Sequence, residues 1–178
     1  LFRSLVAFFA LLTTGCGGKD EPKQKVLNIY SWADYFDPAV LAEFEKANNC
    51  RINYDVYSNN EELLAKMQAG GTNFDIIQPS DYMVTTMTQL KMLEKLDHSK
   101  IPNIANLIES LRHPSYDKDQ SYAIPYVWGI TGIAYNKKYV KEPITCWADL
   151  WKPEYKGHII LLNDNREVFS LALKKTGE

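Results

Sequence analysis

Aromatic, hydroxyl and carboxylate side chains occur together at three places in this sequence, and these residue types could bind a cation. The three groups are Trp32 with Tyr35, Ser80 with Tyr82, and Asp164 with Glu167. Indole and phenol rings attract ammonium ions, with about 0.5 to 2 kcal/mol for each cation–π contact. Carboxylates add charge-assisted hydrogen bonds to an N–H donor. The combination predicts a site for a slender cation with apolar spacers, whereas an anion site would need open amides with Arg or Lys at helix starts.

Each group also has a structural interpretation, which the sequence leaves open. Trp32 and Tyr35 could pack under the helix that follows them, and Ser80 could cap the next helix. Asp164 and Glu167 match a capping box, in which the Glu side chain bonds back to the amide of the cap residue. Because both acids also suit a helix N-terminus, they are expected to start a helix and to face the ligand.

Arg166 lies between the two acids and opposes a cation site unless its side chain points elsewhere. In a helix, residues three apart such as Asp164 and Glu167 share a face, and Arg166 projects in a different direction. The acids therefore keep their expected role as ligand contacts.

Hydrophobic periodicity and capping residues predict alternating strands and helices over the first half of the chain. Asp37 followed by Pro38 is a typical helix start. Ser58 with Glu61 forms an S-x-x-E capping box, and the helix it opens is expected to end at Gly70 and Gly71. We expect strands at residues 26–30, 51–57 and 74–78, each followed by a helix.

This order predicts an α/β fold with a mostly parallel sheet and helices on its faces. In such sheets, ligands bind beyond the carboxyl ends of the strands, and each of the three groups follows the end of a predicted strand. Further along, a polar stretch at residues 97–120 precedes two strand-like runs in "YAIPYVWGITGIAYN". A short helix at residues 145–151, a strand at residues 158–162 and a helix that begins at Asp164 and ends near Gly177 complete the prediction.

Composition excludes few classes but gives no reason to expect nucleic acid as a partner. The chain has 178 residues, 46% of them hydrophobic, with a net charge of −2, and no basic stripe is visible. The sequence contains no G-x-S-x-G elbow, no phosphate-binding G-x-x-x-x-G-K-[ST] loop and no H-E-x-x-H zinc motif, so we expect no enzymatic activity. Cys50 and Cys146 are expected to stay unpaired. No C-x-x-C occurs and the three His residues lack metal-ligand spacing, so neither a metal nor a cofactor is expected.

The N-terminus reads as an export signal. Arg3 precedes an apolar run at residues 5–12, which is too short to span a bilayer. The segment resembles a bacterial lipoprotein signal over residues 1–16, in which Cys16 becomes the lipidated first residue and anchors the protein to the membrane. A simple cleaved signal that removes Cys16 is the alternative. Residues 17–25 are polar and are expected to form a flexible tether.

Several blocks of the chain resemble the spermidine/putrescine-binding proteins of bacterial polyamine ABC importers. The blocks, in family order from residue 26 onwards, are "LNIYSWADYFDP", "FDIIQPSDYMV", "YAIPYVWGITGIAYN" and "WADLWKPEYKGHIILLNDNREVFSLAL". The resemblance implies a type II periplasmic binding protein with two lobes that close over the ligand. It implies a nearly complete first lobe at residues 26–130, a truncated second lobe at residues 131–178 and a crossover near residues 128–131.

The resemblance also implies roles for the three groups of residues. Trp32 and Tyr35 would contact the polyamine chain, Ser80 and Tyr82 would add polar and aromatic contacts, and Asp164 and Glu167 would receive an amino group. The implied partners are the polyamine and the permease subunits of the importer, and the implied location is the periplasm or the outer face of the cytoplasmic membrane. A ferric-ion or amino-acid carrier of the same fold is the alternative.

Overall fold

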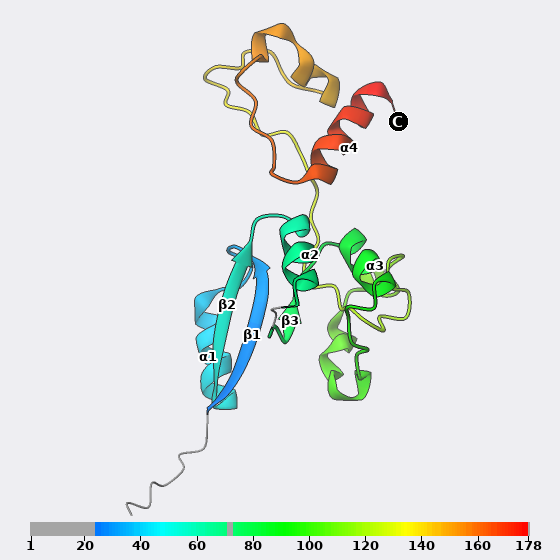
Figure 1. Cartoon of the computed structure of the whole chain (residues 1–178). Coiled ribbons are helices and arrows are strands. Elements are labelled where there is room, and N and C mark those ends of the chain that lie inside the picture. Colours follow the sequence, from blue (N-terminus) through cyan, green and yellow to red (C-terminus); the bar gives the residue numbers. More distant parts are fainter. Residues whose placement is uncertain (1–23, 71–72, 178) are drawn as a thin grey trace, which may run out of the picture.

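A computed structural model describes residues 24–70 and 73–177 of the chain. The expected signal, the expected lipidation residue Cys16 and most of the expected tether lie outside the described residues, as does Gly71. The described residues form two groups of elements joined by an extended stretch of chain (Figure 1). We call them the sheet region, residues 24–127, and the α4 region, residues 130–177.

The sheet region is built on a parallel sheet in the order β2-β1-β3. Its strands are β1 (Lys25–Trp32), β2 (Cys50–Tyr57) and β3 (Ile76–Ile77). The first two match the predicted strands, but β3 is shorter than the predicted residues 74–78. The amides of Asp75 and Gln78 still bond to β1 carbonyls, at 2.9 and 3.1 Å, so the chain runs alongside β1 beyond the bounds of β3.

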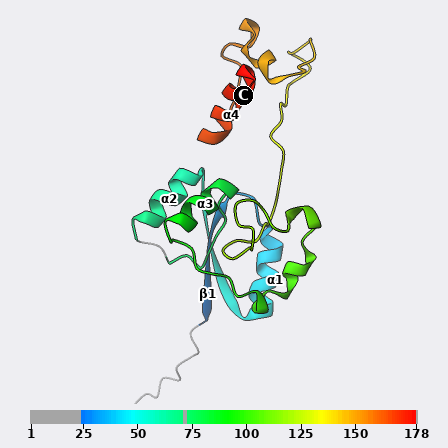
Figure 2. The same ribbon diagram turned by 90° about the vertical axis from the view of Figure 1, so that its right-hand side faces the viewer.

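Helices cover both faces of this sheet. They are α1 (Pro38–Asn48), α2 (Asn60–Gln68) and α3 (Asp81–Gln89). From β1 the chain moves to one side to form β2, and from β2 it crosses back over to form β3 on the other side. Because such crossovers are right-handed, they place α1 on one face and α2 on the other, and Figures 1 and 2 show this arrangement. The predicted β-α-β-α-β-α order is confirmed.

The cap prediction is confirmed for α1 and wrong for α2. The Asp37 side chain accepts a hydrogen bond from the Ala39 amide at 2.8 Å. Asn59, not Ser58, caps α2 and accepts from the Glu62 amide at 2.9 Å, while the Glu62 carboxylate accepts from the Ser58 amide at 2.9 Å. The predicted pattern is thus displaced by one residue, because Asn caps a helix as well as Ser does.

Aromatic and sulfur-containing side chains fill the core between the sheet and the helices α2 and α3. The buried cluster consists of Tyr30, Tyr57, Leu63, Met83 and Met87. Leu63 and Met87 are fully buried, so each helix contributes one face to this core. Cys50 and Cys146 are both free, as predicted. Among the described residues, no helix combines the length and apolar character needed to cross a membrane.

The rest of the described chain contains short helical turns and one longer helix. In the polar stretch 97–120, 3-10 turns occur at His98–Lys100, Pro102–Asn106 and Glu109–Leu111. The α4 region has 3-10 turns at Trp147–Trp151 and Pro153–Tyr155, followed by α4 (Asn165–Thr176). The short helix and the last helix are confirmed, and Gly177 caps the latter with a positive φ of 88°.

The strands predicted within residues 122–136 and at residues 158–162 are wrong for the described chain. Both segments are extended but carry no strand pairing. A strand makes its backbone hydrogen bonds only to a neighbour, and neither segment lies in a sheet here. Ile160, in the second segment, is 96% exposed, although its sequence is that of a buried strand.

Candidate functional site

Aromatic rings cluster at the carboxyl end of β1. The ring centroid of Trp32 lies 4.6 Å from that of Tyr57 and 6.4 Å from that of Tyr35. Trp32 is half-buried, while Tyr35 is 43% exposed. The rings therefore form a partly exposed wall at the edge where a parallel sheet usually binds its ligand.

Hydrogen bonds tie this wall to the ends of all three strands. The Tyr54 hydroxyl donates to the Trp32 carbonyl at 2.5 Å. The Tyr57 hydroxyl donates to the Gln78 carbonyl, and the Ser31 hydroxyl donates to the Gln78 side chain. Burial raises the pKa of Tyr57 most strongly, with neighbouring tyrosines adding to the effect, so this hydroxyl stays protonated and remains a donor.

A residue far along the chain also holds the loop after β1. The Tyr126 hydroxyl donates to the Tyr35 carbonyl at 2.9 Å. The Tyr126 ring stacks on Phe36, with centroids 4.9 Å apart and planes at 21°. The last residues of the sheet region are therefore fastened to the loop that carries Tyr35.

Ser80 occupies the N-cap position of α3, but its side chain makes no capping bond. Its hydroxyl accepts from the Asn60 amide group at 3.0 Å, and its own backbone amide donates to the Asn60 side-chain oxygen at 3.0 Å. Asn60 is fully buried. The Ser80 side chain thus joins α3 to the start of α2, which neither the capping nor the ligand interpretation predicted.

Tyr82 is the point where the sheet region meets the α4 region. The guanidinium carbon of Arg166 lies 4.2 Å from the centroid of the Tyr82 ring. Burial raises the pKa of Tyr82, and the negative charge of Asp164 raises it further. The Arg166 contact thus brings the start of α4, which Asp164 caps, close to Tyr82; the two predicted ligand residues lie 82 positions apart in the sequence.

Asp164 caps α4 as predicted. Its carboxylate accepts from the amides of Arg166 and Glu167, at 2.9 and 3.1 Å. The reciprocal half of the capping box, a bond from the Asp164 amide to the Glu167 carboxylate, is absent from the described residues. Asp164 is half-buried and makes no ion pair within the described part of the chain.

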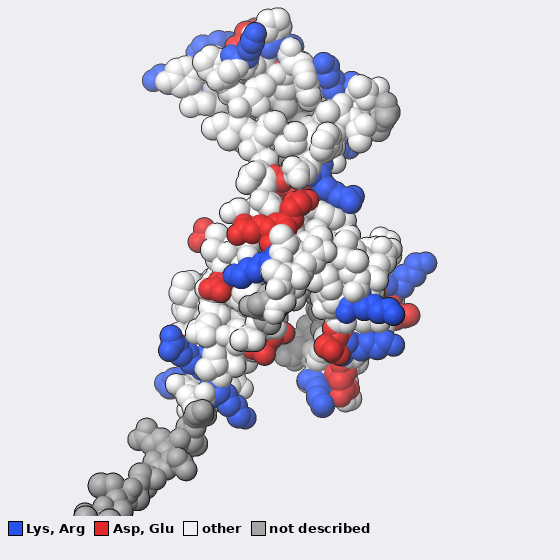
Figure 3. Space-filling view, viewed as in Figure 1, with Lys and Arg blue, Asp and Glu red and all other residues white. Residues whose placement is uncertain are grey.

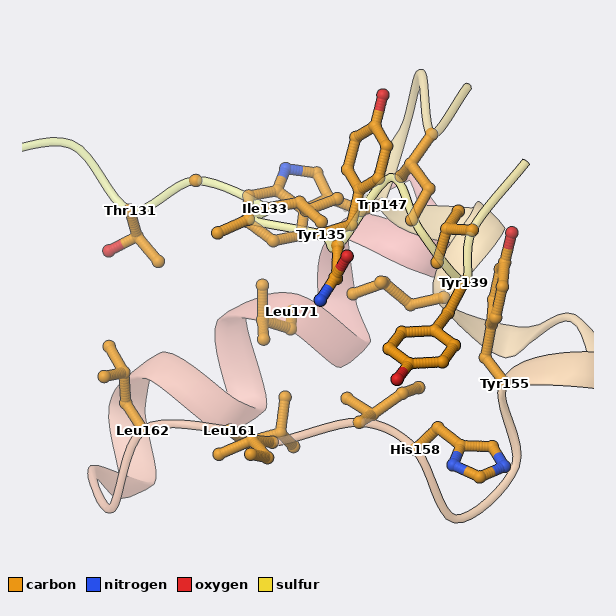
Figure 4. A pocket seen from close by; sticks show the side chains of 18 of the residues that line it. Thr131, Ile133, Tyr135, Tyr139, Trp147, Tyr155, His158, Leu161, Leu162 and Leu171 are labelled. Atoms are coloured by element: carbon orange, nitrogen blue, oxygen red, sulfur yellow. The ribbon is translucent and has the colours of Figure 1, made fainter. Parts of the chain in front are cut away.

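Glu167 lines a large cavity within the α4 region rather than the junction. The cavity has a volume of about 1240 Å³, and its lining is mostly apolar and aromatic. Figure 4 shows Tyr139, Tyr155, Leu161 and Leu171 around this space. The aromatic pair Trp32 and Tyr35 does not line it, so the structure does not place all six predicted residues around one cavity.

Acidic side chains gather where the two regions meet (Figure 3). After burial, the negative charges of Asp164 and of Glu61, in the first turn of α2, raise the pKa of Tyr82, while Arg166 lowers it. The junction therefore combines negative charge with an aromatic face, which suits a cation. Within residues 24–70 and 73–177, no group of His, Cys, Asp and Glu could hold a metal ion.

Sequence reasoning missed several residues that shape this site: Tyr57, Asn60, Tyr126 and the contact of Arg166. Tyr57 ends the second strand, so the carboxyl-edge rule that selected Trp32 would have found it. Nothing in the local sequence indicates that Tyr126 reaches Tyr35.

Comparison with known proteins gives matches over nearly the whole chain. Residues 39–178 match the model of a family described as bacterial extracellular solute-binding protein. The spermidine/putrescine-binding periplasmic protein of Escherichia coli K12 is 38% identical over 177 residues, which are 98% of this chain and 51% of that protein. The chain thus spans about half the length of the curated relatives it matches.

The chain is also similar to solved structures of proteins of this kind. The PotD substrate-binding protein of a spermidine/putrescine ABC transporter from Streptococcus pneumoniae is 40% identical, with a TM-score of 0.70. The TpPotD lipoprotein of Treponema pallidum is 35% identical, with a TM-score of 0.79. Each match covers 86% of this chain and 48% of the solved one.

Proposed function

We propose that this chain, which belongs to the bacterial extracellular solute-binding protein family, captures a polyamine such as spermidine or putrescine outside the cytoplasm. The captured polyamine is delivered to the permease subunits of an ABC importer, without chemical change. The names of the relatives support this ligand, since they are spermidine/putrescine-binding and putrescine-binding proteins. The chain has the α/β fold of a periplasmic binding protein, as its solved relatives do.

The observation that carries the proposal is the contact between Tyr82 and the start of α4, where Asp164 lies. A polyamine presents ammonium groups separated by methylenes. Its ammonium would lie on the Tyr82 ring and donate to the Asp164 carboxylate, and its methylenes would cover the rings of Trp32 and Tyr35. Ser80 and Glu167 complete the proposed contacts. Glu167 lines the α4-region cavity and would have to turn away from it to reach the ligand.

We assign the two lobes of the binding protein to residues 26–130 and 131–178, the second of which is partial. Closure of one lobe on the other would bring the aromatic wall of the first toward the acids of the second. We further propose that residues 1–16 are a lipoprotein signal, that Cys16 carries the lipid anchor and that residues 17–25 are the tether. The description of the Treponema pallidum relative as a lipoprotein supports this anchor.

Isothermal titration calorimetry of the complete gene product tests the function. We expect saturable binding of spermidine or putrescine, and none of ferric ion or of amino acids such as glutamate. Binding of iron or an amino acid in place of a polyamine would favour the alternative carriers of the same fold. Loss of the bound ligand to a chemical product during incubation would contradict the transport role.

A further inference from the structure

We propose that Arg166 is a built-in competitor for the amine, occupying the Tyr82 ring when no ligand is bound; this inference rests on the proposed function. The residue would set the affinity threshold of the site. Only a ligand that presents an ammonium to Asp164 and to the ring at the same time would displace it.

The contact itself supports this role. A guanidinium 4.2 Å from the centroid of the Tyr82 ring is within the range of a cation–π interaction. The Arg166 side chain makes no ion pair or hydrogen bond in the described part of the chain, and Arg166 is exposed. A side chain held by one ring face and otherwise open to solvent can be displaced without breaking other bonds.

The position of Arg166 on its helix is electrostatically unfavourable. It is the second residue of α4, where the helix dipole favours acidic side chains and disfavours basic ones. The ring of Tyr82 compensates for this placement. Asp164, two residues earlier, bonds to the Arg166 backbone amide and not to its guanidinium, so its negative charge is left for an incoming ammonium.

Competition by Arg166 lowers the apparent affinity of the site for its ligand. When the binding-competent form is only part of the population, the apparent affinity falls by that fraction. Removal of the competitor should therefore tighten binding. A residue that itself contacts the ligand, or that positions the acids, would weaken binding when it is removed.

The test compares spermidine and putrescine affinities of the complete protein and its Arg166→Gln variant by calorimetry. We expect Arg166→Gln to bind roughly 2- to 5-fold more tightly, the factor that corresponds to one exposed cation–π contact. Removal of any positive charge from the protein reduces its repulsion of a polycation and so tightens binding slightly. Arg51→Gln removes the same charge elsewhere and is therefore the matched control. Arg51 is exposed and lies at the opposite, amino end of β2, so Arg51→Gln should change the affinity far less.

A second readout needs no ligand. The guanidinium protons of Arg166 should show an upfield ring-current shift by NMR in the free protein, and Tyr82→Leu should remove it. Spermidine should also remove it in the wild-type protein.

The outcomes separate the two proposals. No polyamine binding to either protein refutes polyamine capture. Binding to Arg166→Gln that is equal to or weaker than binding to the wild type, or a ring-current shift that persists at saturating spermidine, refutes the competition and leaves polyamine capture standing.

Discussion

At Asp164 one carboxylate caps a helix and also places its charge beside an aromatic ring. These two roles need different properties of the side chain. Capping needs an oxygen that accepts backbone N–H bonds, which Asn also supplies. Attraction of an ammonium needs the negative charge, which Asn lacks.

Two substitutions at Asp164 therefore separate the roles. Asp164→Asn should keep the melting temperature nearly unchanged and weaken polyamine binding by about 2 kcal/mol or more, since it removes one partner of a charge pair. Asp164→Ala should remove the helix cap as well as the charge, so it should weaken polyamine binding and also lower the stability by about 0.5 to 2 kcal/mol. Calorimetry and thermal unfolding measure the two effects. If Asp164→Asn lowers the melting temperature and leaves affinity alone, the carboxylate serves the helix only.

Asn60 is the buried residue that joins α2 to Ser80, and its removal should destabilise the fold. Asn60→Ala removes both bonds to Ser80 and leaves the partly buried Ser80 amide without its partner, which costs about 1 to 3 kcal/mol. Ser80→Ala is the matched comparison and should cost less, because it removes only the bond from the Asn60 amide group and keeps the bond from the Ser80 backbone amide to Asn60. Urea unfolding of both variants gives the comparison. Equal losses in the two variants would contradict the importance of the backbone bond.

At the scale of single elements, the observed start of α2 makes a simple prediction. Asn59 caps the helix and Ser58 does not, so Asn59→Ala should destabilise the protein by about 0.5 to 2 kcal/mol. Ser58→Ala keeps the Ser58 backbone amide that bonds to Glu62 and should change stability little. Thermal unfolding of the pair measures both. A larger loss of stability in Ser58→Ala than in Asn59→Ala would mean that Ser58 caps α2, as the sequence predicts.

The turn that contains Asp149 is expected to respond to acid. A hydrogen bond from Lys152 and backbone bonds from Thr145 and Cys146 hold the pKa of the Asp149 carboxyl well below its usual range. A depressed pKa means that the carboxylate stabilises the folded turn at and above the ordinary value of about 3.9, and that this stabilisation is lost as the pH falls below it.

Carbon-13 NMR of the Asp149 carboxyl measures this directly. We expect the carboxyl to remain ionised at pH values where ordinary aspartates are already protonated. Lys152→Met should raise its midpoint toward the ordinary value, because it removes the 2.8 Å ion pair. A midpoint near 3.9 in the wild type would contradict the bonding of this turn.

The elements also explain how far sequence reasoning reaches. The first strands and helices carry their own local signals, such as the Asp37 cap and the alternation in β2, so they could be predicted. The segments at residues 122–136 and 158–162 could not, because strand formation depends on a partner elsewhere in the chain. The site followed the same division: the strand-edge rule located Trp32 and Tyr35, but the packing of Arg166 on Tyr82 depends on how two distant segments meet.

At the scale of the whole molecule, the α4 region exposes the side chains that a lobe would normally bury. Ile160 and Ile130 are 96% and 87% exposed, and its large cavity is mostly apolar. The curated relatives are about twice as long as this chain. In the described residues these groups are open to solvent.

A polypeptide that stops at residue 178 should therefore bind the dye ANS strongly and aggregate as its concentration rises. The Escherichia coli K12 relative, of which this chain matches 51%, is the comparison and should do neither. Dye fluorescence and light scattering of the two proteins test this. Weak dye binding by the shorter polypeptide would mean that the α4 region covers its apolar groups by itself.

The bond between Tyr126 and the Tyr35 carbonyl has a consequence for how this molecule can move. The chain leaves the sheet region just after it is fastened to the loop that bears the rings. A rotation of the α4 region about the extended connection would therefore begin beyond that fastening. In such a rotation the rings would stay in place, and the start of α4, which carries the acids, would move toward them.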